Sequence, residues 1–385
     1  MINDKDLYDF SEDEFEDDPR PRKKSGSPVK GALIFTGSLL VVIAMMIIGT
    51  SLYLGIRGDD GTSSSESDAP LIYSQEDLDA SVEKVREEME AEAEEEVESA
   101  YQRGLTDGRM ALLQLIQEKL LGGNSVVETL RPLYAGKVVL VSNGSFHFVD
   151  IDYNLAQSEL VQENLQVLDS GEFQYVEDGT VTSHKGIDVS KHQGQIDWSK
   201  VAADGVEFAF IRCLYRGYGS GALVEDDTFA DNMEGAIDNG IHVGVYVFTQ
   251  AITDEEIIEE AQTAIEMTSQ YASSVPIVVD VERVAGAKPR MDALSVEERT
   301  RLIRLFCDTV SAAGFKPYIY FNTEMSILYL DLTQLQDIPK WYASYTESMF
   351  YPYKYDIWQY SATGSVSGIT GDVDLNISFS DFWSE

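Results

Sequence analysis

From Lys185 onwards, short apolar runs alternate with helical patterns, and this alternation constrains the fold more than any other feature. The runs predict strands at Gly186–Val189, Phe208–Leu214, His242–Phe248, Pro276–Val281, Pro317–Phe321, Trp341–Ser344, Ile357–Tyr360 and Val373–Ile377. Helices are predicted at Phe229–Asn239, Asp254–Gln270 and Ser295–Ala313. Near-continuous apolar strands such as IVVDVE are typical of strands buried on both faces. The pattern therefore predicts an α/β fold, a TIM-like (β/α) barrel over residues 185–385, made irregular by short later connections.

A second segment, Gly31 to Ile56, carries no charged residue over 26 positions. This exceeds the apolar core of a signal peptide and matches the roughly 20 residues of a membrane-spanning helix. Basic residues precede the segment and acidic residues follow it, which predicts a cytoplasmic N-terminus. We therefore expect a single-pass protein of the cell membrane, with a disordered tail at residues 1–30, a transmembrane helix at 31–56 and the remainder outside the cell.

A linker rich in Gly, Ser and Asp is predicted at residues 57–73, followed by a helical stalk at residues 74–122. Within the stalk, Leu78, Val82, Val85 and Met89 recur at helical spacing, and the pattern then slips to steps of four. This pattern predicts a coiled coil that dimerises the chain. The alternative is a single charged spacer helix, because 12 acidic residues against 2 basic ones between Glu76 and Glu98 oppose self-association.

Residues 125–184 predict a small α+β module. The apolar runs Lys137–Val141 and Phe146–Val149 flank an Asn-Gly pair, which is typical of a β-hairpin. A helical patch and a short strand near Phe173–Tyr175 are expected to follow. The residues of this module indicate no chemistry of their own, so we expect it to act as a spacer or to pack against the barrel.

The charge balance argues against one class of partner. The chain has 67 acidic and 28 basic residues, a net charge of −39, and such a chain repels the phosphates of nucleic acids. The sequence contains no Cys-x-x-Cys pair, and its four histidines show no metal-ligand spacing. We therefore expect no nucleic-acid partner, no metal and no cofactor.

Carboxylates lie at the predicted strand ends, where barrels of this type place their active sites. Asp188 ends the first strand, Asp280 and Glu282 end the fourth, and Asp374 lies in the last. Residues 280 and 282 point to one face, roughly 6.6 Å apart along a strand. Neighbouring carboxylates push their pKa values apart, so one can donate a proton while its partner stays charged. Glycoside hydrolysis requires such a pair.

Aromatic residues also cluster at these strand ends and are candidates for stacking against sugar rings. The candidate substrate-binding residues are Tyr215, Tyr246, Phe248, Tyr320, Trp341, Trp358 and Tyr360. Ordinary core packing is the alternative for each ring, and we expect it for about half of them.

Six segments together resemble one known family. They are KGIDVSKHQGQIDWSKVAADGVEFAFIRCLYRGY, GIHVGVYVF, PIVVDVE, KPYIYFN, WYASY and IWQYSATGSVSGITGDVDLNIS, between Lys185 and Phe382. This stretch resembles glycoside hydrolase family 25, the lysozymes or N-acetylmuramidases. The resemblance implies an irregular (β/α) barrel that cleaves the β-1,4 bond after N-acetylmuramic acid in peptidoglycan. One departure is Tyr246-Val247-Phe248, where many members have Tyr-His-Phe.

The resemblance also implies a role for each carboxylate. Glu282 resembles the general acid, and Asp280 resembles the residue that orients the 2-acetamido group of the sugar. Asp188 and Asp374 resemble acids that line the −1 subsite. The family is thought to act with retention, and the spacing of residues 280 and 282 leaves open whether the nucleophile is the acetamido group or a protein carboxylate.

Three other functions compete with this one. A chitinase-like enzyme would carry further aspartates two and five residues before Asp280, where this chain has Val278 and Val275. A catalytically silent barrel would bind peptidoglycan glycan strands as a scaffold, although it would not need all four carboxylates. A purely structural stalk would not explain the barrel. Because the chain is expected to be tethered to its own cell, we expect local wall remodelling.

Overall fold

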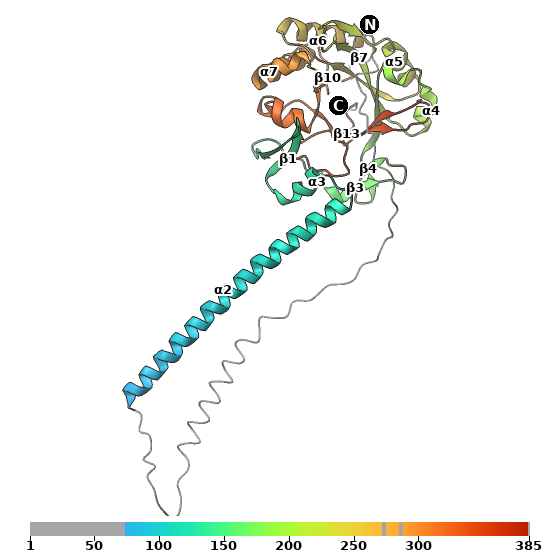
Figure 1. The fold of residues 1–385 in the computed structure, drawn as a ribbon. Coiled ribbons are helices and arrows are strands. Elements are labelled where there is room, and N and C mark those ends of the chain that lie inside the picture. The colour runs from blue at the N-terminus through green and yellow to red at the C-terminus, as the bar shows by residue number, and fades with distance from the viewer. Residues whose placement is uncertain (1–73, 272–274, 285–287, 384–385) are drawn as a thin grey trace, which may run out of the picture. The chain divides into compact units, whose positions relative to one another are not determined.

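The computed structural model describes residues 74–271, 275–284 and 288–383 (Figure 1). The tail, transmembrane helix and linker predicted at residues 1–30, 31–56 and 57–73 lie outside the described residues. Within the described residues, no helix combines the length and apolar composition that crossing a membrane requires. The described residues divide into two units, one ending at Gly108 and the other beginning at Arg109.

Helix α2 spans Gln75–Leu121, 47 residues, and agrees with the predicted stalk. Ser74 caps its start, since the Ser74 hydroxyl accepts the backbone N–H of Asp77 at 3.1 Å. None of its residues is buried, and Leu78, Val82, Val85 and Met89 are all exposed. Because α2 is a continuous helix over these positions, Val82, Val85 and Met89, at steps of three and four, share one of its faces. At about 1.5 Å per residue the helix is roughly 70 Å long.

The α+β module begins with α3 (Val126–Leu130) and a 3-10 turn, η2 (Arg131–Leu133). The predicted hairpin is confirmed as β1 (Lys137–Ser142) and β2 (Ser145–Asp150). Asn143 and Gly144 have φ values of 50° and 73°, the left-handed conformations that a tight hairpin turn requires. The helical patch proves to be only the 3-10 turn η3 (Gln162–Asn164). A small sheet of β3 (Leu165–Val167), β4 (Phe173–Glu177) and β5 (Thr180–Val181) completes the module.

All eight predicted strands of the C-terminal half are present. They are β6 (His184–Val189), β7 (Phe208–Arg216), β9 (His242–Phe248), β10 (Ile277–Asp280), β11 (Pro317–Asn322), β12 (Lys340–Ala343), β13 (Ile357–Gly364) and β14 (Val373–Ser378). They close into a ring in the order β6, β14, β13, β12, β11, β10, β9, β7, which returns to β6, while the short strand β8 (Leu223–Glu225) pairs with β7 outside the ring.

Two features make the barrel irregular. The pairs β13–β14 and β14–β6 are antiparallel, whereas the other pairs of the ring are parallel. Helices follow only the earlier strands, as α4 (Trp198–Ala203), α5 (Phe229–Asp238), α6 (Asp254–Thr268) and α7 (Val296–Ala312). Between β11 and β12 the connection contains only the short helical turns η6 (Met325–Tyr329) and η7 (Leu332–Gln334), and the described residues between β12 and β14 contain no helix. The expectation of short later connections is therefore confirmed.

Alternate residues along the strands face two different cores. One core lies inside the ring and includes Phe208, Phe210 and Trp341. The other lies between the ring and the surrounding helices, which Figure 1 shows on the outside of the strands. Gly186 and Gly244 face the interior, where a Cβ atom would come within 2.1 and 2.2 Å of the rings of Phe208 and Phe210. These two glycines therefore make room for the interior phenylalanines.

Candidate active site

Four carboxylates meet at one rim of the barrel. Asp188 is the second-last residue of β6, Asp280 is the last residue of β10, and Asp374 is the second residue of β14. Because β14 runs antiparallel to β6, its beginning lies beside the end of β6, and Asp374 pairs directly with Asp188. Glu282 follows two residues beyond the end of β10. The structure therefore brings together all four predicted carboxylates, named below the carboxylate cluster.

The position of Glu282 differs from the prediction in one respect. The predicted strand reached Val281, whereas β10 ends at Asp280, so the strand spacing does not set the distance between the carboxyl groups of Asp280 and Glu282. Burial raises the pKa of Asp280 most, and the charge of Glu282 adds to this rise, so the two carboxyl groups lie within electrostatic reach of each other. The orientation of Glu282 depends on the segment that follows the strand.

Two residues of the carboxylate cluster are buried, Asp188 and Asp280, whereas Glu282 and Asp374 are half-buried. Asp188 and Asp280 are each 6% exposed. Burial raises the pKa of Asp188 to about 6. Burial and the charges of Glu282 and Asp188 raise the pKa of Asp280, while Arg212 opposes that rise. The pKa of Asp374 is raised by burial and by Asp188 and Glu282. Carboxyls that hold protons near neutral pH suit acid–base chemistry.

Asp280 has an unusual environment. Its Oδ1 atom is buried and has no hydrogen-bond partner within the described residues. Buried polar atoms are nearly always paired, so such an atom needs an explanation. A substrate group that donates a hydrogen bond would supply the missing partner.

Two amide side chains hold Asp188. Gln359 and Asn376 each donate from their side-chain nitrogen to Oδ2 of Asp188 at 2.8 Å. The oxygen of Asn376 accepts Nε1–H of Trp341 at 2.8 Å. The oxygen of Gln359 accepts the hydroxyls of Tyr320 at 2.8 Å and Tyr345 at 2.9 Å.

These contacts fix the direction of both amides. Each amide oxygen is occupied by O–H or N–H donors, so each amide must present its NH2 group to Asp188. Sequence reasoning missed Gln359, Asn376 and Tyr345. The signal for Asn376 was present, because it lies two residues after Asp374 on the same strand face.

Arg212 is a further site residue that the sequence reasoning missed. It is 5% exposed on β7, and its Nε donates to Asp226 at 2.8 Å. Its positive charge opposes the rise in the pKa of Asp280. Arg212 therefore places a cation beside the carboxylate cluster and is itself held by a buried carboxylate.

The predicted aromatic residues fall into two groups. Tyr215, Tyr246, Phe248 and Tyr320 lie on strands around the carboxylate cluster. In register, Phe248 and Tyr320 flank Asp280, and Tyr215 lies opposite Phe248. Tyr246 is half-buried, and its ring meets that of Trp341 edge-on at 6.1 Å. These four remain candidates for contact with a substrate.

The other three aromatic residues show the core packing that the sequence left open as the alternative. Trp341 is 1% exposed inside the ring and stacks on Phe210 at 4.5 Å, so its ring has no free face for a sugar. Trp358 and Tyr360 belong to the outer core and pack against Phe173 of the module, at 5.4 and 4.2 Å. The register of β13 turns both rings away from the barrel interior, so neither lies at the carboxylate cluster.

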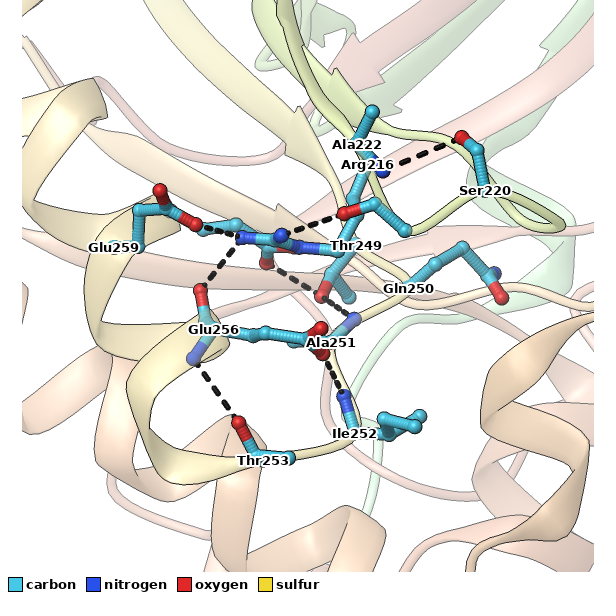
Figure 2. A network of polar contacts seen from close by, with 12 residues as sticks. Arg216, Ser220, Ala222, Thr249, Gln250, Ala251, Ile252, Thr253, Glu256 and Glu259 are labelled. Carbon is cyan, nitrogen blue, oxygen red and sulfur yellow. Dashed lines mark hydrogen bonds and ion pairs between the residues drawn. The ribbon is translucent and has the colours of Figure 1, made fainter.

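A second polar group lies at the end of β7 and beyond the end of β9, and it is built on the buried ion pair of Arg216 and Glu260. We call it the Arg216 network: Arg216, Thr249, Glu256, Glu259 and Glu260. Figure 2 shows Arg216 between the loop that carries Thr249 and the helix that carries Glu256 and Glu259. Arg216 donates to Glu260 at 2.6 Å, to Glu259 at 2.8 Å and to the backbone oxygen of Glu256 at 2.9 Å. Thr249 donates to the other oxygen of Glu260 at 2.6 Å. The network ties α6 to two loops of the active-site rim.

Comparisons with known proteins address this part of the chain. Residues 187–369 match the family model of the Glycosyl hydrolases family 25. The chain is 29% identical over 193 residues to the autolytic lysozyme of Clostridium acetobutylicum, covering 50% of this chain and 55% of that protein. It is 29% identical over 213 residues to lysozyme M1 of Streptomyces globisporus, covering 50% of this chain and 66% of that protein.

The chain thus spans less than two thirds of the length of either relative. A solved family 25 glycosyl hydrolase of Bacillus anthracis is 25% identical, with 56% of this chain and 96% of that chain covered and a TM-score of 0.45. From the family model and the two lysozymes, residues 187–369 of this chain belong to glycosyl hydrolase family 25.

Proposed function

We propose that the chain is a peptidoglycan hydrolase, a lysozyme that cleaves the β-1,4 bond between N-acetylmuramic acid and N-acetylglucosamine. One observation carries the proposal, the convergence of four carboxylates at one rim of the barrel. Within the described residues, the buried Oδ1 atom of one of them, Asp280, has no hydrogen-bond partner. The family match and the two related lysozymes support the substrate class.

The geometry suggests a role for each group. Glu282 donates its proton to the glycosidic oxygen as the bond to the sugar C1 breaks. Oδ1 of Asp280 accepts a hydrogen bond from the N–H of the 2-acetamido group of the sugar. This contact directs the carbonyl oxygen of the acetamido group toward C1, and that oxygen bonds to C1 as the leaving group departs. Water then attacks C1, gives a proton to Glu282 and releases the acetamido oxygen. The configuration at C1 is retained, because C1 is inverted twice.

Asp188 and Asp374 complete the subsite in this proposal. Both lie on strands that face the interior, and Asp188, when it is ionised above a pH of about 6, stabilises the positive charge that develops at C1. The amides of Gln359 and Asn376 keep Asp188 fixed as this charge develops. The half-buried Tyr246 supplies an aromatic surface near the same rim.

A catalytically silent barrel that binds glycan strands is the alternative, and one experiment separates the two. The purified chain is incubated with purified peptidoglycan beside Glu282→Gln and the control Glu234→Gln, which removes a charge from the exposed face of α5. We expect new reducing-end muramic acid, identified by mass spectrometry, from the wild type and the control only. Sedimentation with peptidoglycan without any product would support the silent barrel instead.

We also propose that residues 31–56 anchor the chain in the cell membrane with its N-terminus in the cytoplasm, so that it remodels the wall of its own cell. The length and lack of charge of that segment support this. Fractionation tests it: the full chain should stay with membranes at high pH, and a chain lacking 31–56 should not. Finding the barrel released during normal growth would count against a tethered role.

The exposed apolar face of α2 supports one further proposal, that two copies of the chain pair along this helix. Sedimentation equilibrium of the wild type beside a Val82→Glu, Met89→Glu variant tests it. A wild type that stays monomeric at micromolar concentration would favour the single charged spacer helix.

A further inference from the structure

The tip of the β1–β2 hairpin reaches the segment that carries Glu282. Asn143, the first turn residue, accepts a hydrogen bond at its Oδ1 from Nη1 of Arg283 at 3.3 Å. Arg283 directly follows Glu282 in the chain. The module for which the sequence indicated no chemistry is therefore connected to the carboxylate cluster through a single residue.

Arg283 is held from several sides. Its Nη1 also donates to Glu324 at 3.0 Å and to the hydroxyl of Tyr329 at 3.4 Å. Its Nε and Nη2 atoms face the carboxylate of Asp292 at 3.4 and 3.3 Å. These contacts raise the pKa of Arg283, with Asp292 the largest cause. These contacts fix the guanidinium in position. Of the hydrogen-bond partners named here, Asn143 is the one that belongs to the N-terminal module and not to the barrel.

The hairpin makes a second contact with the same group. Ser142 donates from its hydroxyl to the carboxylate oxygen of Glu324 that also accepts from Arg283. Ser142 pairs with Ser145 across the turn, so the ladder of the hairpin fixes both contact residues. Two adjacent residues of the module therefore hold both members of the Arg283–Glu324 ion pair.

The choice of asparagine at position 143 is informative. Its φ of 50° lies in the left-handed region, which glycine adopts most easily and asparagine tolerates. The same turn recurs at the β4–β5 hairpin, where Asp178 has a φ of 49° and precedes Gly179. Asp178 is exposed, whereas Asn143 places its side-chain oxygen on Arg283. The turn alone does not require the acceptor that residue 143 carries.

We propose that Asn143 is a positioning residue for the reaction, supplied by the N-terminal module. It fixes Arg283, and Arg283 in turn sets the direction of the backbone that carries Glu282 beyond the end of β10. This proposal rests on the function proposed above, in which Glu282 is the general acid. Small displacements of a reacting group lower the rate strongly, so the contact bears on kcat and not on substrate affinity.

Three substitutions test it in the full chain. Asn143→Gly keeps the left-handed turn and removes the acceptor, and we expect kcat on purified peptidoglycan to fall about 3- to 10-fold with KM unchanged. Asn143→Asp keeps both the turn and an acceptor, and should restore kcat to within about 2-fold. Asp178→Gly makes the same backbone change at the matched turn and should leave kcat at the wild-type value.

Several results would overturn the proposal. These are an unchanged kcat in Asn143→Gly, a rise in KM alone, which would make the turn a glycan-binding element, or an equal loss of kcat in Asp178→Gly. Melting temperatures of the two glycine variants show whether they differ in stability. An inactive wild type would refute the proposed function and this proposal together, whereas an active wild type with an unaffected Asn143→Gly refutes the positioning role alone.

Discussion

Two buried acids, Glu260 of the Arg216 network and Asp280 of the carboxylate cluster, differ in how their charges are compensated. In the Arg216 network, Glu260 is fully buried, and both of its oxygens accept hydrogen bonds at 2.6 Å, from Arg216 and Thr249. In the carboxylate cluster, Asp280 is almost as deeply buried, yet its Oδ1 has no partner within the described residues.

The surrounding groups also act on the pKa values of Glu260 and Asp280 in opposite directions. Burial raises the pKa of Glu260 to about 7, and hydrogen bonds from Thr249 and Arg216 oppose the shift. Burial also raises the pKa of Asp280, but there the neighbours Glu282 and Asp188 reinforce the shift. A buried carboxylate with matched donors is typical of a structural element. One left unmatched among like charges reduces stability and is retained where it serves a function.

The largest effect is expected from breaking the compensated group. Arg216→Met removes the guanidinium and leaves Glu260 buried without its cation, so the free energy of unfolding should fall by about 3–5 kcal/mol. Urea denaturation followed by tryptophan fluorescence measures it. Arg216→Met combined with Glu260→Leu should recover part of the loss, because an apolar pair needs no compensation. If Arg216→Met were as stable as the wild type, Arg216 would not compensate the buried charge of Glu260, and the contrast with Asp280 would fail.

The second expected effect has opposite signs for activity and stability. Asp280→Asn should lower kcat on the order of 100- to 1,000-fold, because a fixed charge at the reacting centre is lost. The same variant should be more stable than the wild type, since it removes a buried, repelled charge. Initial rates and urea denaturation measure the two effects. A variant that loses stability as well as activity would place Asp280 with the structural acids.

The stability gain of Asp280→Asn should also depend on pH. Burial and like charges raise the pKa of Asp280, and that of Asp188 to about 6, above values near 4 in the unfolded chain. Between these values the folded state binds more protons, so the unfolding free energy of the wild type falls as pH rises from about 4 through about 6. The difference in unfolding free energy between the variant and the wild type should therefore be small at pH 4 and grow as the pH rises to 7.

The same comparison shows which parts of the molecule the sequence could predict. The strands of the barrel were predictable because burial on both faces produces uninterrupted apolar runs, and the carboxylates stood out because they end such runs. The antiparallel direction of β14 left no such signal, although it brings Asp374 to the rim. The sequence therefore predicted that these acids gather at one rim, but not that an antiparallel strand brings Asp374 there.

Residue partners across the fold were harder to predict. Trp341 and Trp358 both lie on strands rich in aromatic residues. Only the register with neighbouring strands shows that Trp341 faces the interior of the barrel and that Trp358 faces Phe173. The contact of Asn143 with Arg283 joins residues 140 positions apart, and no local pattern encodes it. Local periodicity predicts elements, whereas these contacts depend on how the elements close into a ring.

The smallest effect concerns how the carboxylate cluster is held. Tyr320 and Tyr345 both donate to the oxygen of Gln359, so either one suffices to direct the amide nitrogen toward Asp188. Each single Tyr→Phe variant should lower kcat/KM by about 3-fold or less, the value of one neutral hydrogen bond. The double variant should lose about 10-fold or more, because the buried amide oxygen is then left without a donor and the amide no longer holds Asp188 in one position. A double-mutant cycle on initial rates measures this coupling, with Tyr360→Phe in the outer core as the control. Strictly additive losses would show that the two hydroxyls do not act through Gln359.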